Sequence, residues 1–125
     1  TTGWNGYDIY LDGVKVGNAA GSATPSSPYV IGSSAFRIGQ RQDGAYAFDG
    51  LIDEVSIFTS ALSASDIATL YNSGLPGDIS SLNPFGWWRC GDNDSGTGTT
   101  ITDQGSGSTN GTLINGAAFS TNVPS

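Results

Sequence analysis

Hydrophobic and polar residues alternate along the first part of the chain with the two-residue period of a β-strand. In residues 7–11, YDIYL, large apolar or aromatic residues occupy the odd positions, and Asp12-Gly13 separates this segment from VKV at 14–16. Because Asp-Gly favours the tight primed turn of a two-residue hairpin, the stretch predicts a β-hairpin.

Short apolar runs bounded by Gly, Ser, Pro and Asn recur through the rest of the sequence. The strongest is LIDEVSIF at 51–58, which is apolar on both faces and so predicts a strand between two layers. Further strands are expected at 29–31, 36–38, 87–90, 99–102, 112–114 and 117–120. This density of short strands is typical of an all-β protein, and we predict an antiparallel β-sandwich of the jelly-roll type.

One segment, SASDIATLYNSG at 63–74, has the pattern of a short helix. Ser63 and Asp66 have the spacing of a capping box, and apolar residues follow at i, i+3 and i+4 from Ile67. Gly74 favours a left-handed exit from the helix. The sandwich is therefore expected to carry one short helix.

The segments YDIYLDGVKVGNAAG, GLIDEVSIF and ALSASDIATLY resemble the later half of a laminin-G-like, concanavalin A-like jelly-roll domain in its bacterial and phage versions. The resemblance spans roughly residues 5–74. It implies a fold of two antiparallel sheets and a module that binds carbohydrates or other proteins.

The order of the segments departs from that family. Residues 1–78 resemble the later half of a domain, whereas 79–125, with GWWRCGDNDSGTG and NGTL, resemble the opening of one. Three arrangements would account for this order: a circularly permuted module, the end of one repeat joined to the start of the next, or strands that complete a neighbouring subunit. Because unpaired sheet edges invite pairing with another chain, we expect an assembly or a larger parent protein.

The charge of the chain excludes several classes of partner. The net charge is −7 with only four cations, so no basic patch is available for nucleic acid, and an anionic membrane surface is equally unfavourable. No apolar run reaches the roughly 20 residues of a membrane span.

A looser resemblance of GWWR-x-GD to phage virion proteins implies a virion or extracellular location.

The titratable residues argue against an enzyme. The sequence has no histidine, so neither a Ser-His-Asp triad nor a Cys-His pair is available. In an extended strand Asp49 and Asp53 would be about 13 Å apart, beyond the spacing of glycosidase carboxylates. Asp53 and Glu54 are adjacent and would point to opposite faces of a strand. No catalytic residue is predicted.

The acidic, glycine-rich loop after the two tryptophans offers candidate metal ligands. Asp92 and Asp94 are two residues apart in a turn, and Asp43 lies in a second turn, QDG. The loop lacks the glycine and the closing glutamate of an EF-hand. A looser calcium site of carboxylates and backbone carbonyls is one interpretation of it, and a solvated Asp/Gly turn is the other.

Exposed aromatic residues on a β-sandwich are a usual means of holding a sugar ring. Trp4, Tyr46 and Trp88 are the candidates for carbohydrate stacking. Trp87 and Trp88 point opposite ways if they share a strand, so at most one of them is expected to face outward. Edge packing and subunit contacts use the same residue types.

The single cysteine, Cys90, cannot form an internal disulfide and is expected to be a small buried residue in the WWRC strand.

Taken with the resemblance, the features of the whole sequence predict a non-enzymatic interaction or structural module that self-associates or binds virion or capsid proteins. A carbohydrate-binding module from a larger secreted enzyme or adhesin is the alternative. No cofactor is required, and calcium is the one metal considered.

Overall fold

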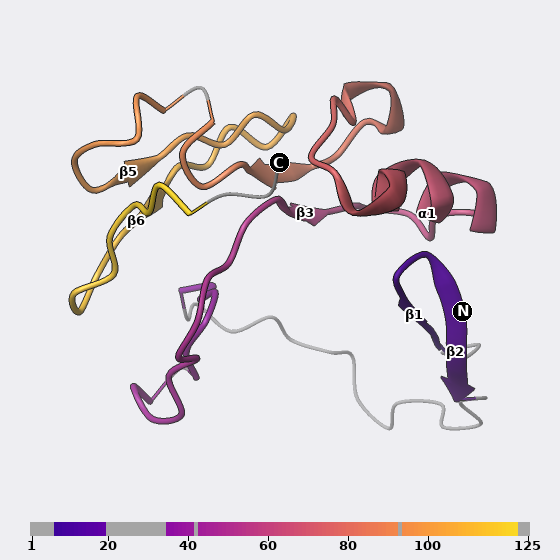
Figure 1. Cartoon of the computed structure of the whole chain (residues 1–125), viewed down its shortest axis with the longest axis horizontal. Coiled ribbons are helices and arrows are strands. Elements are labelled where there is room, and N and C mark those ends of the chain that lie inside the picture. The colour runs from indigo at the N-terminus through magenta and orange to yellow at the C-terminus, as the bar shows by residue number, and fades with distance from the viewer. Residues whose placement is uncertain (1–6, 20–34, 42, 93, 123–125) are drawn as a thin grey trace. The chain divides into compact units, whose positions relative to one another are not determined.

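A computed structural model describes residues 7–19, 35–41, 43–92 and 94–122 (Figure 1). The chain divides into two compact units, Thr1–Gly50 and Leu51–Ser125. Within the described ranges, six strands form three two-stranded antiparallel sheets, accompanied by one α-helix and two short 3₁₀ turns. The expected predominance of strands with one short helix is observed, and the described residues form these small sheets without closing a sandwich.

The predicted hairpin is present in the first unit. Strands β1 (Tyr7–Leu11) and β2 (Val14–Ala19) pair antiparallel across a turn in which Asp12 and Gly13 have φ values of 50° and 74°. Both residues being left-handed is the signature of a type I′ turn. The register shifts between Ile9 and Tyr10, which leaves Val16 as the extra residue of a β-bulge.

The hairpin has one polar and one apolar face. Asp8 and Lys15 lie on the polar face and form an ion pair of 2.8 Å. The large side chains on the other face, and the bulged valine, are each at least half exposed to solvent: Tyr7, Ile9, Leu11, Val14 and Val16. The hairpin's own two strands therefore leave this apolar face uncovered.

Several strands expected from the sequence are shorter than predicted or absent. No strand forms at 36–38 or 117–120, and the run at 29–31 lies outside the described residues. Of the predicted 51–58 strand, only β3 (Val55–Ile57) is extended and paired. The reason is local: Glu54 has a φ of 51°, which interrupts the extended backbone immediately before β3.

The predicted helix is confirmed as α1 (Ala64–Tyr71), with both hydrogen bonds of the capping box between Ser63 and Asp66. The left-handed exit begins earlier than expected, at Asn72 with a φ of 44°, and continues through the 3₁₀ turn η1 (Asn72–Gly74). A second 3₁₀ turn, η2 (Ser80–Leu82), leads toward the next strand.

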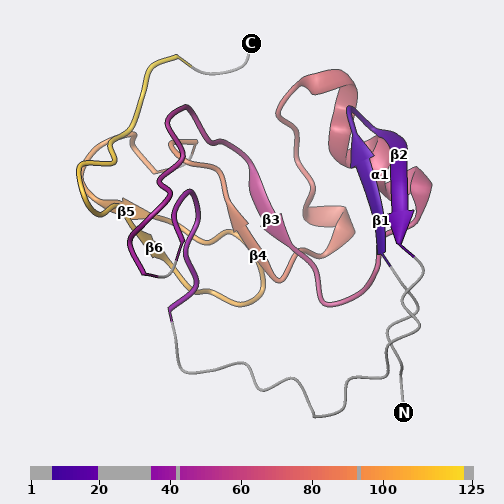
Figure 2. The same ribbon diagram turned by 90° about the horizontal axis from the view of Figure 1, so that it is seen from below.

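Strand β4 (Gly86–Trp88) is the centre of the second unit. It pairs with β3 on one side, and Figure 2 shows these two strands side by side. On its other side, the amides of residues 104, 106 and 107 donate to the carbonyls of residues 87, 84 and 85, and Trp88 forms a β-bridge with Asp103. The remaining pair is β5 (Thr100–Ile101) with β6 (Gly111–Thr112).

This central position explains the small core of the second unit. Trp87 and Trp88 are 4% and 8% exposed, and Ile79 is the third buried hydrophobic residue of the described chain. Glu54 accepts a hydrogen bond from the Trp87 indole, and the Trp88 indole lies against Gly86 and donates to the carbonyl of Thr109. Strand β4 pairs with β3, which lies on the other side of the boundary that the sequence places after residue 78.

Candidate functional site

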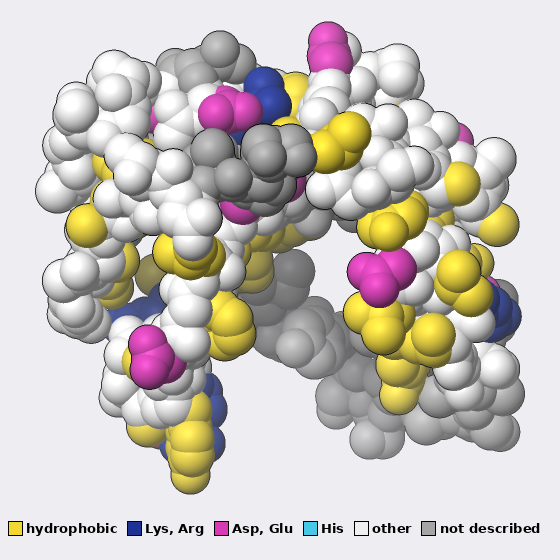
Figure 3. Space-filling model, in the orientation of Figure 1, with side chains coloured by type: hydrophobic (Ala, Val, Ile, Leu, Met, Phe, Trp, Pro, Cys, Tyr) yellow, Lys and Arg dark blue, Asp and Glu magenta, His cyan; other side chains and the backbone are white. Residues whose placement is uncertain are grey.

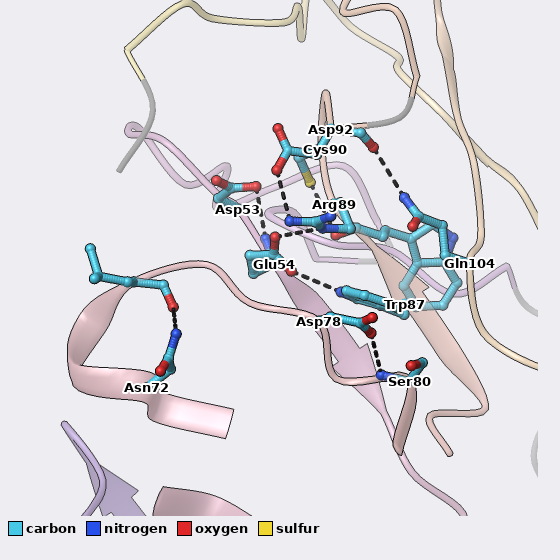
Figure 4. A network of polar contacts seen from close by, with 12 residues as sticks. Asp53, Glu54, Asn72, Asp78, Ser80, Trp87, Arg89, Cys90, Asp92 and Gln104 are labelled. Atoms are coloured by element: carbon cyan, nitrogen blue, oxygen red, sulfur yellow. Dashed lines mark hydrogen bonds and ion pairs between the residues drawn. The ribbon is translucent and has the colours of Figure 1, made fainter. Parts of the chain in front are cut away.

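A network of charged side chains joins the start of β3 to the end of β4 (Figure 4). The two carboxylate oxygens of Glu54 accept hydrogen bonds of 2.8 Å from the indole Nε1 of Trp87 and from Nε of Arg89. Arg89 also pairs with Asp92 at 2.8 Å, and its guanidinium carbon lies 5.1 Å from the centroid of a Trp87 ring. Glu54 thus holds the side chains of Trp87, in β4, and of Arg89, the residue after it.

This arrangement gives Glu54 a structural role. Both of its oxygens are engaged by strong donors, and its main partners lie 33 and 35 residues away in the chain. A carboxylate held in this way is poorly placed to attack or deprotonate a substrate, because proton transfer or attack would break an ion pair that is largely shielded from solvent. The network supports the expectation that Glu54 is not a catalytic residue.

An open groove of about 260 Å³ lies beside this network. Two acidic residues, Asp53 and Glu54, contribute to its lining. Glu54 has a left-handed φ and both residues precede β3, so the strand rule that places neighbours on opposite faces does not apply to them. The apolar part of the lining comes from α1 and the segment that follows it: Leu70, Tyr71, Leu75, Pro76 and Ile79.

Asp53 has a different environment from its neighbour. Its Oδ1 accepts a 2.9 Å hydrogen bond from the amide of Glu54, and among the described residues it makes no ion pair. Burial raises the pKa of Asp53, and the negative charges of Glu54 and Asp92 act in the same direction. The groove therefore contains one carboxylate whose charge is not balanced by a direct partner.

The structure separates the candidate metal ligands. The carboxylate of Asp92 pairs with Arg89, and Oδ1 of Asp94 accepts a 2.8 Å hydrogen bond from the amide of Thr102. Oδ2 of Asp94 is buried without a hydrogen-bond partner in the described structure. No group of three or more acidic or cysteine side chains in the described ranges is arranged to hold a metal ion. A looser calcium site that uses backbone carbonyls stays a prediction.

The second metal candidate, Asp43, is engaged within its own turn. Arg41 Nε donates to its carboxylate at 2.9 Å and the amide of Ala45 donates at 3.0 Å, and the hydrogen bond from Arg41 is the main cause that lowers the pKa of Asp43. Tyr46 in the same turn is 78% exposed, with the guanidinium carbon of Arg41 4.3 Å from its ring centroid. Tyr46 is thus an accessible aromatic residue that already stacks with a cation.

The remaining carbohydrate candidates have different outcomes. Trp4 lies outside the described residues. The indole of Trp88 is buried and donates a 3.0 Å hydrogen bond from Nε1 to the carbonyl of Thr109. Neither Trp87 nor Trp88 is exposed, which agrees with the expectation that at most one of them faces outward. The structure assigns Trp88 to the core instead of to a sugar-stacking surface.

Cys90 follows β4 in a left-handed conformation with a φ of 48°, which ends the strand before the cysteine. Its thiol is partly buried and donates to the carbonyl of Trp88 at 3.6 Å. Burial, together with the nearby charges of Asp53, Glu54 and Asp94, raises the pKa of Cys90 to about 11. The thiol is therefore protonated at neutral pH.

We expect the Cys90 thiol of the folded chain to react with a disulfide reagent such as Ellman's reagent about a hundredfold more slowly at pH 8 than the same thiol in concentrated urea. The reason is that only the thiolate reacts, and its fraction at pH 8 is far below that of an ordinary cysteine with a pKa near 8.5. Absorbance at a series of reagent concentrations gives both rate constants. Equal rates in the folded and unfolded chain would contradict the raised pKa.

Neither the network nor the groove could be predicted from the spacing of residues in the sequence. The contacts between Glu54, Trp87 and Arg89 join segments more than thirty residues apart, and no local spacing reports them. One signal was available: Arg89 is the only cation after residue 50, and Glu54 is the only glutamate of the chain. Charged side chains of this kind tend to be paired when they are buried.

Comparison with protein families identifies the chain from its first half. The family model of the concanavalin A-like lectin/glucanases superfamily matches residues 1–68. The chain belongs to this superfamily. No curated protein and no solved structure matches it. This match confirms the family resemblance that the sequence analysis drew from the hairpin, the GLIDEVSIF segment and the capped helix.

Membership in the concanavalin A-like superfamily favours a carbohydrate-binding or interaction module. Domains of this kind are generally binding modules without catalysis, although the superfamily also contains glycosidases. The chain has no histidine, and its one glutamate is held in an ion pair with Arg89. These features favour binding over acid–base or nucleophilic catalysis. In the part of the chain that the structure describes, no helix is long and apolar enough to cross a bilayer.

Proposed function

We propose that this protein is a non-enzymatic interaction module that assembles with copies of itself on an extracellular or virion surface. The observation that carries the proposal is the uncovered apolar face of the β1–β2 hairpin, defined by Tyr7, Ile9, Leu11 and Val14. Hydrophobic side chains gather over this hairpin in Figure 3. A contiguous apolar patch of this kind usually marks an interaction site.

The stability of the hairpin supports the same proposal. A two-stranded hairpin is marginal by itself in water, and its apolar face needs a covering layer. Among the described residues, β1 and β2 pair only with each other, so no described strand pairs with either outer edge of this sheet. A second copy of the hairpin supplies a matching apolar face, and such a self-complementary contact closes with two-fold symmetry.

The chemistry of the rest of the surface supports an exposed location. The chain has a net charge of −7 and is rich in glycine, serine and threonine. Strong net charge opposes non-specific association, so contacts are confined to patches where apolar groups dominate. The proposal also includes virion or capsid proteins as partners, because they would bind the same apolar face of the hairpin.

Light scattering on the whole chain at several concentrations tests the assembly. We expect a defined oligomer that dissociates on dilution, and we expect Ile9→Thr to weaken association about tenfold, because it removes apolar area from the contact. Tyr10→Thr is the matched control, since Tyr10 is the next residue of the same strand and faces the polar side with Lys15. A monomer at every concentration, or an equal effect of both substitutions, would overturn the proposal.

Carbohydrate binding is the second candidate, and the exposed ring of Tyr46 favours it. One face of that ring is stacked with Arg41, so a sugar would have the other face. Light scattering for the mass, combined with NMR spectra recorded during glycan titration, separates the two candidates. A monomer whose Tyr46 resonances shift on glycan titration would favour this second function over assembly.

A further inference from the structure

The groove beside the Glu54 network combines two kinds of surface. Leu70, Leu75 and Pro76 contribute apolar lining, and Ile79, one of the three buried hydrophobic residues, lies with them. Asp53 and Glu54 contribute carboxylates. An occupant that matches this lining needs an apolar stem and a positive end.

The two carboxylates of the groove are not equivalent toward a cation. Glu54 is satisfied by Trp87 and Arg89, whereas Asp53 accepts one backbone hydrogen bond and forms no ion pair in the described structure. Arg89 directs its own donors to Glu54 and Asp92. Asp53 is thus the carboxylate that an incoming cation would neutralise.

The charge of the surrounding unit has the same sign. From residue 51 to the end, the sequence contains seven acidic residues and a single cation, Arg89, which is already paired. A cation that enters the groove therefore meets a favourable field over a wide area. An anionic or neutral polar occupant would gain nothing from it.

We propose that this groove receives a lysine side chain of a partner protein, with its aliphatic stem against Leu70, Leu75 and Pro76 and its ammonium group at Asp53. The volume of about 260 Å³ suits one side chain, since pockets for whole small molecules start near 300 Å³. Lysine combines a flexible four-carbon stem with a compact charge, which is the combination that the lining requires. This site belongs to the second unit and does not depend on the hairpin contact.

Amide chemical shifts of the isotope-labelled whole chain test the site with two peptides. The probe is acetyl-Gly-Lys-Gly-amide, and its control replaces lysine with norleucine, which keeps the stem and lacks the charge. We expect saturable shifts of Gly74, Gly77 and Ile79 with the lysine peptide at millimolar concentration. The norleucine peptide is expected to bind at least about fivefold more weakly.

Asp53→Asn is expected to lower the affinity for the lysine peptide about fivefold, while its carboxamide oxygen still accepts the hydrogen bond from Glu54. Asp49→Asn is the matched control, since it removes the same charge from an exposed site in the first unit and should change the affinity less than twofold. Unchanged shifts elsewhere in each variant report an intact fold.

Three results would overturn the lysine site. Equal binding of the two peptides would show an apolar groove without charge recognition. Equal losses in Asp53→Asn and Asp49→Asn would show attraction by the net charge alone. No shift of the groove amides at 10 mM peptide, about the upper limit for a weak single-residue contact, would show that the groove takes no lysine. None of these results depends on the oligomeric state, so failure here and failure of the hairpin assembly are distinguishable.

Discussion

Replacing Asp103 with alanine is expected to lower the free energy of unfolding by about 3 kcal/mol. The Asp103 carboxylate is 8% exposed and accepts 2.8 Å hydrogen bonds from the backbone amides of Trp87, Gly105 and Thr109. It thereby holds the loop 103–109 against β4. Alanine leaves these three donors without an acceptor in a region that solvent reaches poorly. Urea unfolding followed by tryptophan fluorescence measures the loss.

The control for this prediction is Asp49→Ala, which removes an exposed carboxylate and is expected to cost less than about 0.5 kcal/mol. Asp103→Asn adds a second check. Its carboxamide oxygen can still accept two of the hydrogen bonds, but its NH₂ group would oppose the amide of Thr109. We therefore expect an intermediate loss. A loss under about 1 kcal/mol for Asp103→Ala would show that the three hydrogen bonds contribute little.

The same carboxylate makes stability depend on pH with a definite sign. Burial alone would raise the pKa of Asp103, but the hydrogen bonds from Thr109, Trp87 and Gly105 outweigh it and hold the pKa below the usual value. A lowered pKa stabilises the fold above the unfolded-state value of about 3.9 and loses this effect as the pH falls further. Wild-type stability should therefore decline below about pH 4 more steeply than that of Asp103→Ala.

Local signals in the sequence predicted the parts of the fold that depend on neighbouring residues. Asp12-Gly13 specifies the hairpin turn because both residues tolerate a positive φ, and Ser63 with Asp66 specifies the start of α1 because the two groups satisfy each other's amides. The two-residue alternation of 7–11 likewise separates the faces of β1 correctly. Each of these rules acts over a few residues.

The parts that could not be predicted depend on distant contacts or on unexpected backbone angles. The left-handed φ of Glu54 interrupts the extended backbone before β3, although neither glycine nor asparagine marks the position, and both Asp53 and Glu54 line the groove. The burial of Trp88 depends on the segment around Thr109 and Gly111, which contacts its indole although it lies more than twenty residues away. Binary patterning of the WWRC segment contains no information about that distant segment.

The acidic loop shows the same limit for the candidate site. The spacing of Asp92 and Asp94 is compatible with metal binding, but Asp92 is held by Arg89 and Asp94 by the amide of Thr102. A carboxylate in a turn has several competing partners, and only the fold decides among them. The spacing of acidic residues in a sequence can therefore suggest metal ligands, but it cannot exclude that the same carboxylates have structural roles.

Replacing Gly105 with alanine is expected to lower the free energy of unfolding by about 3 kcal/mol, the second large effect. A methyl group built on Gly105 would lie 2.5 Å from the carbonyl oxygen of Phe85 and 2.9 Å from Cα of Gly86. These neighbours are backbone atoms, so no side-chain rotation relieves the overlap. The segment 103–107 would have to move away from β4, which would weaken the Asp103 hydrogen bonds as well. Urea unfolding again provides the measurement.

Gly111→Ala is the matched control, because its added methyl group would meet the nearest atom, Cβ of Ile101, at an ordinary 3.6 Å. We expect it to change the stability by less than about 1 kcal/mol in either direction. Gly105 and Gly111 belong to the same unit, so Trp87 and Trp88 report on both. Equal losses for the two variants would show that loss of glycine alone destabilises the unit. A loss confined to Gly105→Ala would show that close backbone packing against β4 holds the loop 103–109 in place.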